Sequence, residues 1–388
     1  MDNLNGYKAF DPGMICKGKQ YQENTDYEEE GGKICEKGMM HYCVNPFDVL
    51  NFYPLVNDSG KISDFAAVES LEEPVSGDDG IFATKKLHIG IKLGLAGFVN
   101  ACIDYIKKET IVNAPSSTVE SYSAQIGSSG NYAQIGSSGD SVKIGNSGDY
   151  AKIGSSGNYA QIGNSGYYAK IGSSGYYAKI GSSGYYAKIG SSGNYAQIGS
   201  SGNYAQIGSS GYYAKIGSSG YYAKIGSSGD YAQIGNSGDY AKIGSSGDYA
   251  KIGSSGDYAQ IGSSGNYAKI GSSGDYAQIG SSGNSAQIGS SGYYAKIGSS
   301  GDYAQIGSSG NSAQIESAGK DSVICCAGRD SAVKAKAGSW ITLAEWEYSE
   351  AKNRYVPKCV KTEYVDGERI KADIWYKLID GEFAEVSL

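Results

Sequence analysis

One nine-residue unit fills half of the chain and constrains its fold more than any other feature. From Gly127 to Ile315 the sequence divides, without insertion or deletion, into 21 units of the form Gly-Ser-Ser-Gly-Asn/Asp/Tyr-Tyr-Ala-Lys/Gln-Ile, whose positions we number 1 to 9. The unit explains most of the 59 glycines and 35 tyrosines. Its period is not the three-residue period of collagen, and such a fixed short repeat is typical of solenoids.

The alternation inside each unit predicts a short strand followed by a tight corner. In Tyr-Ala-Lys/Gln-Ile, Ala and Ile share one face of a strand, and Tyr shares the other with Lys or Gln. Gly-Ser-Ser-Gly supplies two residues that tolerate the positive φ of a corner. Because Ala and Ile are small, we predict a thin core between two sheets, with two units per coil. The expected fold class is mostly β: a two-sheet β-solenoid with about 18 residues per coil.

The outward positions 6 and 8 are candidate binding residues. Stacking of identical side chains at strand spacing is a sufficient structural reason for such ladders. The functional interpretation is a long aromatic surface for a macromolecule, and the candidate partners are a glycan, another polymer or another copy of the chain. The candidates are Tyr168, Tyr177, Tyr186, Tyr213, Tyr222, Lys170, Lys179, Lys188, Lys215 and Lys224.

The residues before the array, 1–117, predict a separate α+β domain. Asn45 is suited to cap a helix that begins at Pro46. Ile81–Ile91 predicts a strand and Leu95–Lys107 a helix. The solenoid is then expected over residues 118–315.

The residues after the array, 316–388, predict two atypical turns followed by a β-meander. Asp366-Gly367 and Asp380-Gly381 are expected as hairpin turns. An open solenoid end exposes unpaired strand edges, so we expect this β-rich segment to act as a cap. It is also the segment through which a homo-oligomer could form.

Candidate chemistry is sparse. Cys16, Cys35, His41 and Cys43 could supply four zinc ligands by type, but their spacing is not a standard zinc motif, and buried structural thiols are the competing interpretation. Calcium is disfavoured, because position 5 is Asp in only 8 of the 21 units. We expect no cofactor.

Charge and apolar patterning restrict the partners and the compartment. The net charge is −7 and basic residues form no dense patch, so nucleic acid is not an expected partner. The apolar stretch Leu87–Ile106 is interrupted by charges, and no membrane span is predicted. The N-terminus has no signal-peptide pattern and the seven cysteines are odd in number, which favours reduced thiols in a cytosol.

Several N-terminal motifs resemble those of one known family of proteins. Gly6-Tyr7-Lys8-Ala9-Phe10, Cys16-Lys17-Gly18-Lys19-Gln20-Tyr21, the segment from Cys35 to Cys43, Asn45-Pro46-Phe47-Asp48-Val49 and Asn51-Phe52-Tyr53-Pro54 resemble an N-terminal domain of unknown function in phage and prophage proteins. The usual Gly-Phe-His-x-Cys element is one residue longer here, as Gly38-Met39-Met40-His41-Tyr42-Cys43. The family often joins this domain to nonapeptide arrays and a β-rich tail. The resemblance implies a phage or mobile-element origin and no activity. It therefore implies a location in the cytoplasm of the bacterial host or in a virion, and it adds a host protein to the candidate partners.

These observations predict a non-enzymatic protein, a rigid solenoid that presents tyrosine and Lys/Gln ladders for binding or as a structural spacer. The first alternative is an enzyme with a catalytic, ADP-ribosyltransferase-like N-terminal domain and a solenoid that recruits substrate. The second alternative is an inhibitor or sponge of a host defence system.

Overall fold

The computed structural model describes residues 4–30, 38–57, 60–77, 80–109, 116–119 and 123–388. The chain is mostly β and contains a β-solenoid of about 12 turns with about 18 residues per coil, as predicted. It divides into two compact units, Met1–Ala223 and Lys224–Leu388, which are described separately below. No helix in the described part of the chain is long and apolar enough to cross a membrane.

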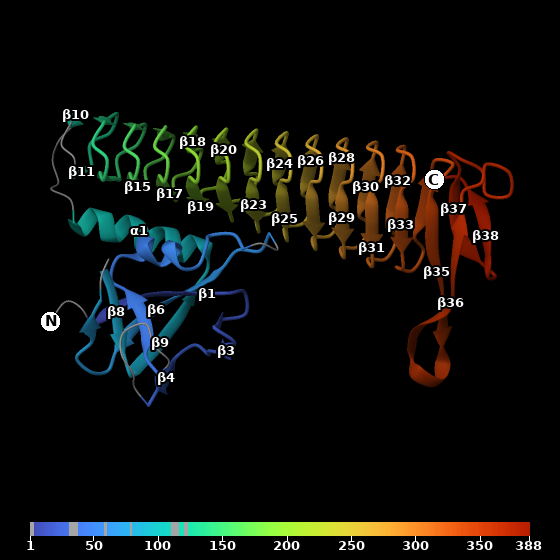
Figure 1. Cartoon of the computed structure of the whole chain (residues 1–388), viewed down its shortest axis with the longest axis horizontal. Coiled ribbons are helices and arrows are strands. Elements are labelled where there is room, and N and C mark those ends of the chain that lie inside the picture. Colours follow the sequence, from blue (N-terminus) through green and yellow to red (C-terminus); the bar gives the residue numbers. More distant parts are fainter. Residues whose placement is uncertain (1–3, 31–37, 58–59, 78–79, 110–115, 120–122) are drawn as a thin grey trace. The chain divides into compact units, whose positions relative to one another are not determined.

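The first unit begins with a small domain built on one antiparallel sheet of seven strands, in the order β4-β9-β6-β1-β5-β8-β7 (Figure 1). These strands are β1 (Asn5–Phe10), β4 (Thr25–Glu28), β5 (Met40–Cys43), β6 (Asp64–Ser70), β7 (Val75–Ser76), β8 (Ile81–Thr84) and β9 (Lys86–Leu93). A separate hairpin joins β2 (Ile15–Cys16) to β3 (Lys19–Gln20). The predicted α+β domain is confirmed as a sheet with one helix.

Local predictions in this domain are confirmed with two differences. Asn45 caps a helix that starts at Pro46, but the helix is the short 3-10 helix η1 (Pro46–Asn51). The stretch Ile81–Ile91 forms two strands instead of one, because the chain bends at Lys85 and β8 and β9 pair with different neighbours. The predicted helix is present as α1 (Leu95–Glu109).

The solenoid strands are short and regular. From β10 (Ser116–Val119) to β34 (Ala332–Ala335), each strand spans four residues and begins nine residues after the previous one. Within Met1–Ala223, β14 (Lys152–Ser155) pairs in parallel with β16 (Lys170–Ser173), so that Ile153 lies beside Ile171. Since paired residues are 18 apart, each coil contains two units of the repeat, and alternate units form two different sheets.

Side chains from three positions of the nine-residue unit fill the solenoid interior. Ala at position 7 and Ile at position 9 are buried, as expected, and so is the residue at position 2, which is Ser or Asn. The strand consists of positions 8, 9, 1 and 2, which places position 2 on the same face as Ile. Asn164 illustrates the polar part of this core: its Nδ2 donates to the main-chain oxygen of Gly166 (3.2 Å).

The corner differs from the predicted one. In most units the residue with positive φ is the tyrosine of position 6, for example Tyr258 (φ 56°), and the array glycines are not among the described glycines with positive φ. Position 4 is glycine for a different reason: an added Cβ on Gly256 would lie 2.1 Å from the main-chain oxygen of Gly238, one coil earlier. The tyrosine ladders therefore line the turns and not the flat strand faces.

The second compact unit, Lys224–Leu388, ends in the β-rich cap that the sequence predicts. The coil pattern continues through β33 (Val323–Cys326) and β34, and two hairpins follow. One hairpin, β35 (Trp340–Ser349) and β36 (Arg354–Tyr364), pairs with β33, and its strands flank the 3-10 helix η3 (Glu350–Lys352). The other, β37 (Trp375–Ile379) and β38 (Glu382–Val386), pairs with β34. Each hairpin therefore covers an exposed strand edge of one sheet.

The two predicted turns of the cap have different outcomes. Asp380-Gly381 is confirmed as the turn between β37 and β38, with φ of 50° and 75°. The prediction for Asp366-Gly367 is wrong, because these residues connect β36 to β37, which lie in different sheets. Asp366 still orders this connection, since its Oδ1 accepts hydrogen bonds from the N–H groups of Glu368 (2.9 Å) and Ile370 (3.0 Å).

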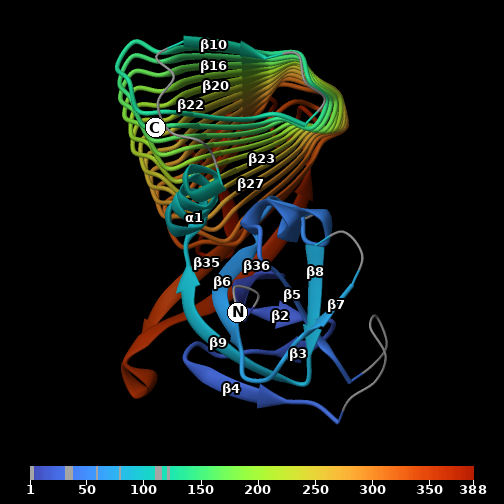
Figure 2. The ribbon, with the colours of Figure 1, turned by 90° about the vertical axis from the view of Figure 1, so that its left-hand side faces the viewer.

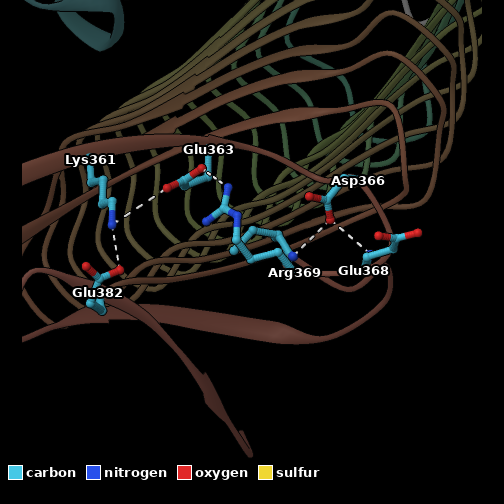
Figure 3. A network of polar contacts seen from close by, with 7 residues as sticks. Lys361, Glu363, Asp366, Glu368, Arg369 and Glu382 are labelled. Atoms are coloured by element: carbon cyan, nitrogen blue, oxygen red, sulfur yellow. Dashed lines mark hydrogen bonds and ion pairs between the residues drawn. The ribbon is translucent and has the colours of Figure 1, made fainter.

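Ion pairs connect the two hairpins (Figure 3). Nζ of Lys361 on β36 lies 2.5 Å from a carboxylate oxygen of Glu382 on β38 and 3.7 Å from Glu363. Glu363 also pairs with Arg369, and the hydrogen bond from that guanidinium holds the pKa of Glu363 below its usual value. The cap therefore has polar links between its two layers in addition to its strand pairing.

The close approach at position 4 predicts the result of a matched pair of substitutions in the second unit. We expect Gly256→Ala to destabilise the solenoid by about 1–3 kcal/mol or more, because backbone atoms must move to accommodate the methyl group. Gly262→Ala at position 1, where nothing lies within 4 Å of an added Cβ, should be neutral or slightly stabilising. Urea unfolding followed by circular dichroism measures both, and equal effects would contradict the proposed contact.

Candidate functional site

Two kinds of surface on the solenoid and one cavity in the N-terminal domain are the candidates for function. The first surface consists of the tyrosine ladders, which are stacks of position-6 rings from every second unit. In the first unit of the chain, Tyr150, Tyr168 and Tyr186 are neighbours in one ladder, with ring centroids 5.0 and 4.9 Å apart and interplanar angles of 6° and 3°. Another ladder contains Tyr195 and Tyr213, whose centroids are 5.1 Å apart.

The predicted tyrosine candidates all lie in these ladders and are exposed. Tyr168, Tyr186 and Tyr222 belong to the first ladder, and Tyr177 and Tyr213 to the second. The ring faces are covered by the neighbouring rings above and below. The ring edges and hydroxyl groups are therefore the parts that a partner could contact.

The second surface is the flat outer face of the strands, formed by positions 8 and 1. Lys170 on β16 and Lys188 on β18 (Lys188–Ser191) are exposed neighbours in one sheet, and Lys224 on β22 (Lys224–Ser227) is also exposed. An added Cβ at Gly172 or Gly190 would meet nothing within 4 Å. This face is therefore open at Lys170 and Lys188, which belong to Met1–Ala223, and at Lys224, which belongs to Lys224–Leu388.

The predicted role of Lys179 as an outer-face ligand residue is not supported by its position. Its Nζ donates to the main-chain oxygen of Phe47 (2.9 Å) and to Oδ1 of Asn51 (2.8 Å), both in the N-terminal domain, and burial lowers its pKa. Lys215, in the same sheet, is partly buried. The three Asn residues of position 2, Asn146, Asn164 and Asn236, all lie in the sheet of Lys179. Other units are identical in sequence on both sheets, such as those that begin at Gly190 and Gly199, so the repeat itself does not show which sheet is covered.

The covering element is α1, which lies between the sheet of the N-terminal domain and the solenoid coils (Figure 2). One side of the helix packs on its own domain, where the rings of Phe98 and Phe65 stack with centroids 3.8 Å apart. The other side packs on position-1 glycines: an added Cβ on Gly199 would lie 3.2 Å from Val99. The missing side chains at position 1 allow the helix to approach the sheet closely.

The acidic and amide residues of position 5 have a structural role. In the second unit, Oδ1 of Asp257 accepts a hydrogen bond from the N–H of Asp275 (2.8 Å), and Oδ1 of Asn266 accepts one from Asn284 (3.0 Å). Each side chain thus satisfies a main-chain donor of the next coil. Asp and Asn are interchangeable in this role, which explains why both occur at position 5; the tyrosines found there in six units have no Oδ1 acceptor.

A cavity of about 610 Å³ lies in the N-terminal domain, and we call it the N-terminal cavity. It brings together Lys8 of β1, Cys16 of β2, His41 and Cys43 of β5, and Tyr53 after η1. Pairing of β1 with β5 places these distant segments side by side. Nζ of Lys8 donates to the main-chain oxygen of His41 (2.8 Å), and the hydroxyl of Tyr53 donates to Sγ of Cys16 (3.1 Å).

Burial controls the protonation of these groups. It lowers the pKa of Lys8 and of His41, because a charged form is disfavoured away from water. It raises the pKa of Cys43 and of Tyr42 to about 12, and it also raises the pKa of Tyr53. The Cys43 thiol and these phenols are therefore neutral at neutral pH.

The predicted zinc ligands are placed only in part. Cys16, His41 and Cys43 all line the N-terminal cavity, whereas Cys35 lies outside the described residues. Across the described ranges, no group of three or more His, Cys, Asp or Glu residues is arranged to hold a metal ion. The six cysteines within those ranges are free thiols. The four-residue zinc set stays a prediction that metal analysis of the purified protein can test.

Comparison with known proteins identifies one domain. Residues 4–101 match the family model of a domain of unknown function, DUF7666. The chain therefore has an N-terminal DUF7666 domain followed by a β-solenoid. The match includes all residues that line the N-terminal cavity and ends within α1. No curated protein and no solved structure matches the chain.

Sequence reasoning missed Lys8 and Tyr53 as members of the cavity. Lys8 had a detectable signal, because it interrupts an otherwise apolar strand, Tyr7-Lys8-Ala9-Phe10, at a position that alternation assigns to the face of Phe10. Tyr53 had none, since a tyrosine after a short helix is common in protein cores.

The tyrosine ladder predicts a difference between two tyrosines with the same backbone conformation. Tyr258 stacks on Tyr240 and Tyr276, with centroids 4.9 Å away on both sides, whereas the residues one coil from Tyr303 are Ser285 and Asp321. We expect Tyr258→Ala to destabilise by about 1 kcal/mol or more through lost stacking, and Tyr303→Ala to have a much smaller effect. Thermal unfolding midpoints compare the two. Equal losses would assign the effect to the turn itself.

Contact between α1 and the glycine column predicts a second matched pair. Gly199→Glu should separate the DUF7666 domain from the solenoid, because the new carboxylate would be buried against Val99, Leu55 and Leu95. Gly190→Glu, in an open strand position, should leave the contact intact. Hydrogen exchange of the α1 amides measures this, with faster exchange expected only for Gly199→Glu. Unchanged exchange in that variant would contradict the contact.

Proposed function

We propose that the chain is a non-enzymatic binding scaffold, in which the rigid solenoid presents rows of tyrosine hydroxyls to an extended partner with a repeating structure, namely a polysaccharide. The observation that carries this proposal is the uniform spacing of the ladder rings, for example 5.0 Å between Tyr231 and Tyr249 and 4.9 Å between Tyr240 and Tyr258. A row of equally spaced groups suits a polymer, because each coil can repeat the contact of the one before.

The geometry of the ladders favours hydrogen bonding over ring stacking as the mode of contact. Neighbouring rings occupy both faces of an internal tyrosine, so a sugar ring cannot stack on it. The hydroxyl group at the exposed edge can donate and accept hydrogen bonds. Lysine rows on the open sheet, such as Lys170 and Lys188, add positive charge, which supports an acidic polysaccharide in particular.

The resemblance of the N-terminal motifs to phage and prophage proteins supports placing this role in a phage or mobile element. The corresponding location is the bacterial cytoplasm or the virion. In this proposal the cap ends the solenoid and the DUF7666 domain is attached through α1.

Affinity electrophoresis tests the proposed function, with gels that contain neutral dextran or acidic polygalacturonate. We expect the polysaccharide, above all the acidic one, to retard the full chain. Replacing Tyr168, Tyr186 and Tyr204 together by Phe keeps the stacked rings and removes three hydroxyls, so it should weaken retardation by about tenfold.

The control is Tyr303→Phe, which removes an exposed hydroxyl whose neighbours one coil away, Ser285 and Asp321, are not tyrosines, and it should leave retardation unchanged. If neither polymer retards the wild-type chain, or if the triple Phe variant is retarded equally, the ladders do not bind polysaccharide through their hydroxyls. A structural spacer would then be the remaining role of the solenoid.

The N-terminal cavity favours a second candidate, which places the activity in the DUF7666 domain. Its buried Lys8 beside the thiol Cys16 is a constellation that a purely structural domain does not need. Both alternatives from the sequence, an enzyme and an inhibitor or sponge of a host defence system, would use a small-molecule site of this kind.

A further inference from the structure

The N-terminal cavity has the size and the walls of a small-molecule site. Its volume of about 610 Å³ lies in the range of ligand pockets. Aromatic side chains contribute much of its lining. They are Tyr7, Tyr21, Tyr42, Phe52 and Tyr53.

The charges around the cavity are unbalanced. Its lining contains three lysines, Lys8, Lys17 and Lys19, and one carboxylate, Glu29. Glu29 forms an ion pair with Lys19, which leaves Lys8 and Lys17 without a carboxylate in the lining. Lys17 is exposed, so water compensates its charge, but Lys8 is only 8% exposed.

Lys8 is therefore an incompletely compensated buried cation. Within the described part of the chain it forms no ion pair. Its partners are the main-chain oxygen of His41 (2.8 Å), the Cys16 side chain and the ring of Phe10, whose centroid lies 5.8 Å from Nζ, and none of them carries a full negative charge. An ammonium group has three protons to donate, so one remains for a ligand. Burying a charge without a counter-ion is costly, and an anion beside Nζ would remove that cost.

We propose that the N-terminal cavity binds a small organic anion with a flat apolar body, whose carboxylate, sulfonate or phosphate group lies beside Nζ of Lys8. The aromatic walls contact the apolar body, and Lys17 at the rim attracts the negative charge. This site is independent of the role proposed for the solenoid ladders.

The protonation of the walls agrees with such a ligand. Burial keeps the Cys43 thiol and the Tyr42 and Tyr53 phenols neutral, so they add no negative charge that would repel an anion. Burial also lowers the pKa of Lys8, and a bound anion favours its charged form again. Binding of the anion thus stabilises the protonated lysine.

The test uses two fluorescent probes of similar shape and different charge on the full-length protein. They are 8-anilinonaphthalene-1-sulfonate, an aromatic anion, and N-phenyl-1-naphthylamine, its neutral counterpart. We expect saturable binding of the sulfonate at one site per chain, tighter than binding of the neutral probe. Lys8→Met should weaken sulfonate binding by about tenfold or more and leave the neutral probe within about twofold.

Two further variants make the result decisive. Lys170→Met removes an exposed lysine of the solenoid and should leave both affinities unchanged, which excludes binding on the open sheet. Lys17→Met removes an exposed rim charge, so it should fold even if Lys8→Met does not, and it should weaken the sulfonate by about threefold. The proposal is overturned if both probes bind the wild type equally. It is also overturned if Lys8→Met and Lys17→Met, or whichever of the two folds, binds the sulfonate as tightly as the wild type does.

Discussion

Each coil of the solenoid lies against the next through the main chain of position 4. A Cβ on Gly256 would lie 2.1 Å from the oxygen of Gly238, and the same approach recurs in the first unit of the chain, where a Cβ on Gly175 would lie 1.8 Å from the oxygen of Gly157. Only glycine permits this distance. The contact holds the turns of successive coils directly above one another at strand spacing, and the stacked tyrosines and the Lys/Gln rows depend on that alignment.

The tyrosines occupy a conformation that glycine or asparagine would adopt at lower cost. A left-handed backbone costs a residue with a Cβ about 1–2 kcal/mol. Stacking of aromatic pairs contributes about 0.5–1.5 kcal/mol. Because the two energies are similar, a tyrosine that stacks on both sides, such as Tyr258, can offset the strain of its own turn. The ladder therefore stabilises the solenoid, and any binding role uses only the edges and hydroxyls that stacking leaves exposed.

Most of the fold could be predicted because the nine-residue period is visible in the sequence. The prediction of two repeats per coil followed from the small size of Ala and Ile. Glycine in a corner suggests positive φ by default, so the sequence did not reveal that its role is close approach and that Tyr takes the strained conformation. The sheet covered by α1 could not be identified, since units such as those of Gly190 and Gly199 are alike. The N-terminal cavity could not be assembled either, because Lys8 and His41 meet only through the pairing of β1 with β5.

Because paired residues are 18 apart, two repeats lie in the same sheet only when they are separated by an even number of repeat lengths. Successive nine-residue repeats alternate between two sheets. Within the described part of Met1–Ala223, the position-1 glycines of only one of these sheets contact Val99 and Leu95 of α1. A deletion or duplication of a single unit would transfer every later strand to the opposite sheet, and each hairpin of the cap would then follow the other sheet. A change of two units would restore every strand to its own sheet. An array that varies in length by recombination can therefore preserve both ends only in steps of a whole coil.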